Sequence, residues 1–168
     1  MKKLPIRTLL PAALVAAVLV GTASTSPLGG GPILTGECIL LPPVGDPNCI
    51  ATTLIETGSG EFTGYGRQCN VFTGDELTFE ITSYEIVGDM VCVAGPITST
   101  DNPAPQFAVG NTTAYCILDN GNGGAGAPDS ATAGQGPPGL TIQDILGIFG
   151  PPPPEAFAPA VSGNFKIH

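Results

Sequence analysis

Apolar and polar residues alternate most clearly along ELTFEITSYEIV, residues 76–87. From Leu77 to Ile81, every second residue is apolar and the residues between them are Thr and Glu. This period of two predicts a β-strand with one buried face. The alternation loses its phase near Ser83 and Tyr84, so we expect a bulge or a bend there.

Shorter runs of β-branched and apolar residues fill much of the remaining chain. Clusters of Gly, Pro, Asn and Asp, which favour turns, separate these runs. Glycines interrupt 61–72, which is interpreted as two short strands. The other predicted strands lie at 38–41, 49–57, 90–98, 106–110, 112–118 and 161–168. Turns at such regular intervals predict an all-β domain, an antiparallel β-sandwich or barrel-like fold.

One short segment has helical periodicity instead. In GLTIQDILGIFG, Thr141 is a suitable N-cap and Asp144 follows three residues later. Gly150 and the four prolines after it end the helix predicted at 141–149. Its apolar residues share one face: Ile142, Ile145, Leu146 and Phe149. The helix lies within a Gly/Pro-rich insertion, 134–160.

The N-terminal residues have the pattern of a secretory signal peptide, with three basic residues followed by an apolar run and small residues. We expect the signal peptide to span 1–23 and a flexible segment to span 24–36. Residues 37–168 then form a single β domain.

The processed chain is strongly acidic. All 14 acidic residues follow residue 23, whereas only Arg67 and Lys166 remain of the basic residues, which leaves a net charge near −12. Nucleic-acid binding depends on Lys and Arg meeting phosphates, so nucleic acid is excluded as a partner. We expect no membrane insertion after signal removal. The acidity indicates either solubility outside the cell or cation binding.

Five cysteines, all in the exported part, predict disulfide bonds. Five cannot all pair within one chain, and the spacing alone leaves the connectivity open. The pairs expected are Cys38–Cys49, which closes a proline-rich loop, and Cys92–Cys116, which joins two core strands. Cys69 would then be free, either as an intermolecular disulfide partner or reactive thiol, or as a buried, inert one.

The sequence DNGNGGAGAPD, residues 119–129, is a candidate calcium loop. Carboxylate and amide oxygens are suitable calcium ligands, and glycines let backbone carbonyls join them. The spacing does not match an EF-hand. A second interpretation is structural, because Asp-Asn-Gly starts a turn without any metal. The candidate ligands are Asp119, Asn120, Asn122 and Asp129.

Catalytic chemistry has little support in the sequence. His168 is the last residue, so a Ser-His or Cys-His pair would depend on the chain end. Glu80 and Glu85 could form a carboxylate pair for sugar hydrolysis, but the chain has no tryptophan to stack a sugar ring. We therefore expect no enzymatic activity and no obligatory cofactor, with calcium as the one cation to test.

Three pieces of the chain in this order resemble a group of small bacterial secreted β domains, which also occur behind surface-anchoring modules. They are VCVAGPITSTDNPAPQF (91–107), TAYCILDNGNGGAGAPDSA (113–131) and SGNFKIH (162–168). In that group a strand enters an Asp-Asn-Gly turn near a second acid, and a Gly-Asn strand ends in His. The resemblance implies a β fold, an extracellular location and no established enzymatic activity. This chain departs in its insertion, its extra cysteines and Ser162, where glycine is usual.

These observations predict an exported structural or interaction domain whose partner is a protein or a cell-surface component. One alternative is a calcium-dependent extracellular binding module that uses the 119–129 loop. Another is a small secreted inhibitor of a second protein, which would use an exposed loop such as 101–106.

Overall fold

The computed structural model describes residues 30–42, 46–58, 60–121 and 128–168, and every structural statement below concerns these residues. The predicted signal peptide lies outside them. The described chain is mostly strand, as predicted. The strands are β1 (Pro32–Leu40), β2 (Asn48–Glu56), β3 (Phe62–Asn70), β4 (Glu76–Glu80), β5 (Ser83–Val87), β6 (Met90–Thr100), β7 (Thr112–Leu118), β8 (Ser130–Gly136) and β9 (Ala158–Ile167).

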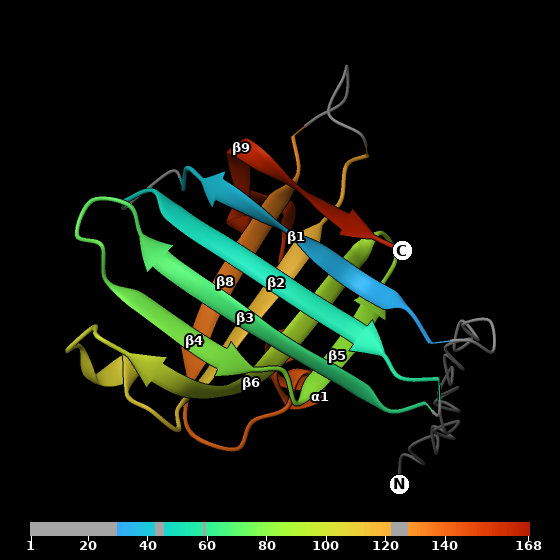
Figure 1. Ribbon diagram of the computed structural model, residues 1–168, viewed down its shortest axis with the longest axis horizontal. Helices are drawn as coiled ribbons and strands as arrows, with labels where there is room; N and C mark the ends of the chain where they lie inside the picture. Colours follow the sequence, from blue (N-terminus) through green and yellow to red (C-terminus); the bar gives the residue numbers. More distant parts are fainter. Residues whose placement is uncertain (1–29, 43–45, 59, 122–127) are drawn as a thin grey trace, which may run out of the picture.

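All strand pairings are antiparallel, and they close on themselves. The order is β4-β3-β2-β1-β9-β8-β7-β6-β5, and β4 also pairs with β6. Figure 1 shows β1 to β4 in one layer and β5 to β8 crossing behind it. The sheet is therefore a flattened, barrel-like sandwich, in which β9 joins the layers on one side and β6 joins them on the other.

The strand predicted at 76–87 has the expected break. Residues of β4 pair with the end of β6, and residues of β5 pair with its beginning. The chain bends at Ile81 and Thr82, between the two strands. On β6, Gly95 faces this bend, and a Cβ there would collide with the carbonyl of Glu80. The close approach explains why a glycine interrupts an otherwise apolar strand.

The main core lies between the layers. Its largest fully buried side chains are Tyr115, Phe79 and Phe165. The ring of Phe79 occupies the space above Gly66, and the ring of Phe165 lies against Gly36, where a Cβ would collide with each ring. The prediction that glycines break 61–72 into two strands is wrong, because the glycines of β3 make room for core side chains within one continuous strand.

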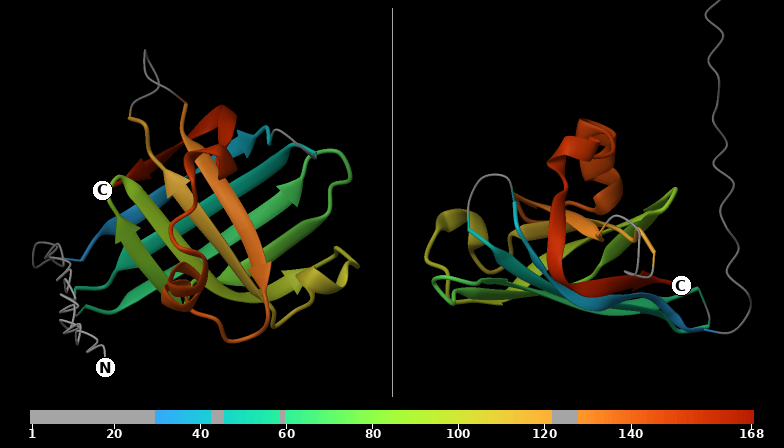
Figure 2. Two further views of the ribbon diagram at one scale, coloured as in Figure 1. Left: turned by 180° about the vertical axis from the view of Figure 1, so that it is seen from behind. Right: turned by 90° about the horizontal axis from the view of Figure 1, so that it is seen from above.

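The helix prediction is confirmed. Helix α1 (Ile142–Phe149) begins after Thr141, whose side chain accepts a hydrogen bond from the Asp144 N–H, while the Asp144 carboxylate accepts one from the Thr141 N–H. Figure 2 shows α1 on the outer face of the second layer. Its apolar residues pack there in a second cluster with Met90, Cys92, Ala94, Ala114 and Cys116. Phe149 departs from the prediction, because it lies at the helix end and is 78% exposed.

The sequence-based assignments of three segments are wrong. Strand β1 begins at Pro32, so residues 32–36 of the segment predicted to be flexible belong to the sheet, where Leu34 is fully buried. Residues 106–110 form the end of a 3-10 helix, Pro105–Phe107, and a turn. Strand β8 was not predicted, because SATAGQG is made of small and polar residues.

Candidate functional site

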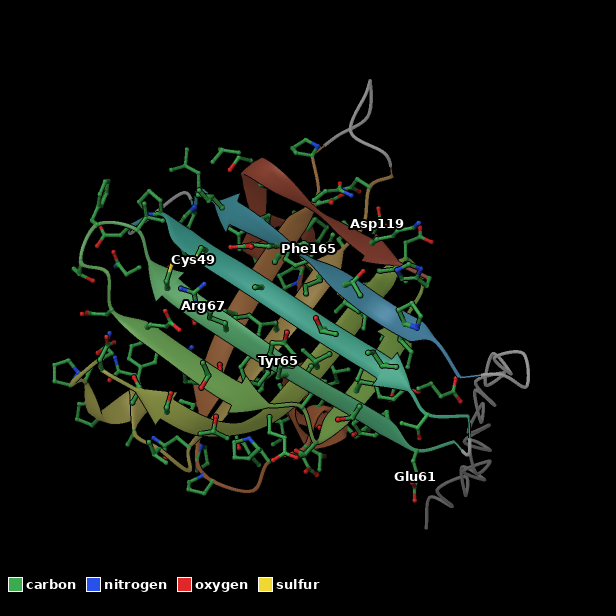
Figure 3. The ribbon with its side chains drawn as sticks, viewed as in Figure 1. Cys49, Glu61, Tyr65, Arg67, Asp119 and Phe165 are labelled. Carbon is green, nitrogen blue, oxygen red and sulfur yellow. A yellow bond between two sulfur atoms is a disulfide. The ribbon has the colours of Figure 1, made fainter. Side chains whose placement is uncertain are left out.

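The loop acid Asp119 is bonded to the C-terminal strand. Its Oδ2 accepts a hydrogen bond from the Ile167 N–H at 3.0 Å. Its Oδ1 accepts one from the Gly121 N–H at 2.8 Å, which forms the expected Asx turn. Figure 3 shows Asp119 beside the C-terminal half of β9. Both oxygens of this carboxylate therefore hold backbone groups.

The second acid, Asp129, makes the same type of contact from a buried position. Its side chain is 4% exposed. Its Oδ2 accepts a hydrogen bond from the Phe165 N–H at 2.7 Å, and its Oδ1 accepts one from the Asn120 N–H at 3.0 Å. Its backbone carbonyl also accepts from the Ala160 N–H at 2.7 Å. Asp129 therefore binds both the start of the loop and two points on β9.

The course of β9 explains this arrangement. The strand pairs with β8 only at Ala158 and Pro159, but it pairs with β1 from Ala160 to Ile167. Beyond residue 159, one edge of β9 therefore has no partner strand among the described residues. The carboxylates of Asp119 and Asp129 satisfy N–H groups at that edge, and we call these two residues the acid latch.

The structure brings together three of the four predicted calcium ligands: Asp119, Asn120 and Asp129. Asn120 contributes its side-chain amide to the loop itself, since Nδ2 donates to the Pro128 carbonyl at 2.7 Å. Asn122 lies outside the described residues. Among the residues with assigned positions, no group of three or more His, Cys, Asp and Glu side chains could hold a metal ion.

Both disulfides join residues that face each other on neighbouring strands. Cys92–Cys116 links β6 to β7, as predicted. The predicted pair Cys38–Cys49 is wrong, because Cys49 is bonded to Cys69 on β3. In the β1–β2 register Cys38 lies opposite Ile50 and points into the core, whereas Cys49 lies opposite Ile39 on the outer face. Side chains on opposite faces of a sheet cannot meet.

The free cysteine is therefore Cys38 rather than Cys69. Its side chain is 1% exposed, and it lies opposite Gly163 of β9. Burial raises the pKa of the Cys38 thiol to about 12, and the negative charge of Asp129 adds to this effect. Cys38 is thus a protonated, inert thiol, in line with the second interpretation given for an unpaired cysteine.

The candidate catalytic groups do not converge. Nε2 of His168 contacts the Thr35 hydroxyl at 3.2 Å, and the His168 N–H donates to the Ile33 carbonyl at 3.0 Å. Glu85 accepts a hydrogen bond from Gln143 of α1 at 3.0 Å, whereas Glu80 is exposed on β4.

A hollow of about 360 Å³ opens between the layers where β2 begins and β3 ends. We call it the polar hollow. Its volume falls in the lower part of the range for ligand pockets, about 300–1,000 Å³. Three of its polar residues, Asp46, Asn48 and Gln68, lie in or just before β2 and β3, and the other two, Thr132 and Gln135, lie on β8. Its apolar residues come mainly from β8, β9 and the 3-10 helices Pro105–Phe107 and Pro154–Ala156: Leu40, Pro42, Ile50, Phe107, Ala131, Ala133, Ala156 and Ala158.

A buried tyrosine orients the polar wall. Tyr115 is fully buried, and its hydroxyl donates to Oε1 of Gln68 at 2.6 Å. Burial raises the pKa of this hydroxyl above its ordinary value, so it stays a donor at physiological pH. With Oε1 engaged, Gln68 directs Nε2 toward Oδ1 of Asn48 at 3.5 Å, which is too long for a good hydrogen bond. One amide donor and one amide acceptor therefore remain incompletely used.

The rim of the polar hollow carries further hydrogen-bonding groups. Nδ2 of Asn48 donates to the Asp46 carbonyl at 2.9 Å, which fixes the orientation of that amide. The Asp46 carboxylate accepts from Nδ2 of Asn70 at 3.1 Å through Oδ2. Gln135 of β8 lies opposite Thr113 of β7 and is exposed at the rim. Contacts within the protein therefore order the Asn48 amide and the Asp46 carboxylate before any ligand arrives, whereas the Gln135 side chain makes no hydrogen bond to the described residues.

Phe107 connects the polar hollow to a smaller one of about 120 Å³, which Asp75, Glu76 and Asn102 also line. Phe107 follows the 101–106 loop, and two hydrogen bonds of Asn102 hold that loop in place. The Asn102 N–H donates to the Thr100 hydroxyl, and Asn102 Oδ1 accepts from the Ala104 N–H, each at 3.0 Å. The loop predicted as an inhibitory surface thus leads directly into the residue that supplies an aromatic ring to the hollow.

The charge around the polar hollow is negative. Asp46 lines the larger hollow and Asp75 the smaller one. Arg67, one of the two Lys and Arg residues that the structure describes, forms a 2.6 Å ion pair with Glu76. Figure 3 shows Arg67 with Tyr65, which is 62% exposed, on the outer face of β3. The polar hollow therefore repels anions.

Sequence reasoning did not find the polar hollow. Asn48, Gln68 and Gln135 lie far apart in the sequence, and only the strand register brings them together. A weak signal existed: Gln68 is a polar residue within the predicted strand segment 61–72, at a position that the structure turns inward, where apolar residues are expected.

No family model, curated protein or solved structure matches this chain. Within the described residues, no helix has the length and apolar character needed to cross a membrane.

Proposed function

We propose that this chain is an exported, non-catalytic interaction domain that binds an extracellular or cell-surface partner through the polar hollow. The observation that carries the proposal is a preoriented polar wall on a closed, disulfide-linked sheet. Binding sites commonly combine an apolar lining with a few fixed polar groups, and the polar hollow has this composition.

Export is supported by the two disulfides, which persist in oxidising compartments outside the cytoplasm. The N-terminal pattern of a signal peptide and the acidic composition agree with this location. The resemblance to small bacterial secreted β domains remains a prediction.

The non-catalytic character is supported by the state of the groups that could react. Cys38 is buried and protonated, and His168 contacts the Thr35 hydroxyl at the C-terminus. The acids of the 119–129 loop hold backbone N–H groups.

We further propose that the acid latch serves the fold rather than a calcium ion. Each of its four carboxylate oxygens already accepts a backbone hydrogen bond. A bound cation would compete with these contacts or share the same oxygens. The calcium-dependent module and the secreted inhibitor remain alternatives to be tested.

Binding of fluorescently labelled protein to intact cells of the producing organism tests the proposal. Saturable binding that unlabelled protein competes is expected. Gln135→Ala should weaken it several-fold, because Gln135 lies at the rim without a side-chain hydrogen bond among the described residues. Gln143→Ala, on α1, is the matched control and should bind normally. Absence of saturable binding, or equal loss in both variants, would contradict the proposal.

A further inference from the structure

We propose that the polar hollow binds a neutral saccharide residue. This inference rests on the proposed interaction role and names the chemical class of the ligand. A pyranose ring presents hydroxyl groups at its edge and C–H groups on its faces. The polar hollow has a matching division, because its amide and carboxylate groups lie mainly on the β2 and β3 side and its small apolar residues mainly on the β8 and β9 side.

The incompletely paired amides fit one hydroxyl group. A sugar hydroxyl both donates and accepts. Nε2 of Gln68 is a donor, Oδ1 of Asn48 is an acceptor, and 3.5 Å separates them. A hydroxyl that lies against both atoms would accept from Gln68 and donate to Asn48. Tyr115 holds the Gln68 amide and the Asp46 carbonyl holds the Asn48 amide, so little ordering is needed on binding.

The rim offers partners for neighbouring hydroxyls. The Asp46 carboxylate can accept from a hydroxyl, and such a charge-assisted hydrogen bond is stronger than a neutral one. The Gln135 amide can donate and accept. These groups surround the same opening, so adjacent hydroxyls of one ring can use them together.

The apolar wall fits the C–H face of the ring. Phe107 lines both hollows and supplies the aromatic surface. Ala131 and Ala158 are small enough to leave room beside it. Because the chain has no tryptophan, the contact area is modest, and we expect a dissociation constant in the range of about 0.1–10 mM for a single sugar residue.

Charge and hydrogen bonding together favour a neutral ligand. Asp46 and Asp75 oppose an anion. A cationic side chain would seek the carboxylates, but Asp75 lines only the smaller hollow and Asp46 lies at the rim, where its Oδ2 also accepts from Asn70. The unused pair at the centre consists of neutral amides.

The test is a titration of the purified protein, labelled with ¹⁵N, followed through the side-chain amide signals of Asn48, Gln68 and Gln135. The probes are methyl glycosides of glucose, galactose, mannose and N-acetylglucosamine, each raised to about 20 mM, twice the upper bound expected for the dissociation constant. At least one probe should shift these signals saturably. Asn48→Ala should weaken that probe about tenfold, since it removes the central acceptor. Asn164→Ala, on the exposed part of β9, is the matched control and should bind like the unaltered protein.

Three results would overturn the assignment: no shift with any glycoside, shifts confined to other residues, or equal binding by Asn48→Ala. Arginine amide serves as the cationic probe, and saturable shifts of the same signals by arginine amide but not by glycosides would make the hollow a cation pocket. If labelled protein still bound cells and Gln135→Ala still weakened that binding several-fold, the proposed function would stand and only the saccharide assignment would fall. Loss of both would remove both proposals.

Discussion

Replacing Asp129 by Asn tests the acid latch at its most buried point. The asparagine has nearly the same shape, but one of the two carboxylate oxygens becomes an NH₂ group. That group must face either the Phe165 N–H or the Asn120 N–H, each of which now donates to an oxygen. A hydrogen bond to a charged group contributes about 1.5–3 kcal/mol, and a buried donor left unpaired costs about 1–3 kcal/mol.

We therefore expect Asp129→Asn to lower the free energy of unfolding by about 2–4 kcal/mol. Asp119→Asn should cost less, about 1–2 kcal/mol, because the Ile167 N–H is only part-buried and the Gly121 N–H is exposed. Asp89→Asn, in the exposed turn between β5 and β6, is the charge-matched control and should change stability by less than about 0.5 kcal/mol.

Urea unfolding of the three variants gives the energies, and amide hydrogen exchange shows where the structure loosens. Exchange should speed up first at Phe165 and Ile167 in the Asp129 and Asp119 variants. If Asp129→Asn were as mild as Asp89→Asn, or if exchange at β9 did not change, the reasoning about the acid latch would be wrong.

Three further predictions concern the core and the helix. Cys38 should resist iodoacetamide in the native protein at pH 8 and react only on unfolding, because it is buried and its pKa is raised to about 12. Since that pKa exceeds the ordinary 9.0, the contribution of the Cys38 thiol to stability is complete below pH 9 and falls by up to about 1.4 kcal/mol per pH unit from there toward pH 12. Cys38→Ala should lack this fall in urea unfolding measured at alkaline pH. Gly66→Ala should destabilise the protein by about 1–3 kcal/mol in urea unfolding, because its Cβ would occupy the space of the Phe79 ring, and a neutral result would contradict this packing. The hydrogen bonds from Thr141 lower the pKa of Asp144, so the capping box should persist below the ordinary carboxyl pKa of 3.8 and be lost only as pH falls through the lowered value; chemical shifts of the Thr141 amide follow this, and a loss with its midpoint at or above pH 3.8 would refute it.

The sequence predicted those parts of the fold that local patterns determine. Alternation marked β4 and its break, and the Thr141 capping box marked the start of α1. The errors arose where tertiary contacts override local preference. Glycines in β3 suggested a break because their role, making space for Phe79 and Ile81, depends on tertiary packing against β4 and the bend after it. Strand β8 lacks large apolar residues, so it carried no pattern.

The candidate sites show the same contrast between features that local sequence marks and features that tertiary contacts create. The 119–129 loop was recognisable from its residues, but its partners Phe165 and Ile167 contribute backbone N–H groups, which leave no trace in a sequence. The correct partner of Cys49 required the register of β2 and β3. The polar hollow required the register of several strands at once, so it could not be assembled before the fold was known.

Thermal unfolding of the purified protein with calcium and with chelator shows whether the 119–129 acids serve the fold or a cation. A ligand at 100 times its dissociation constant stabilises the native state by about 2.7 kcal/mol. This stabilisation raises the midpoint of thermal unfolding by roughly 8–10 °C for a chain of this size. We predict the same midpoint in millimolar calcium and in chelator, and an equal decrease in both for Asp119→Asn. A calcium-dependent rise that Asp119→Asn abolishes would contradict the account and make the loop a cation site.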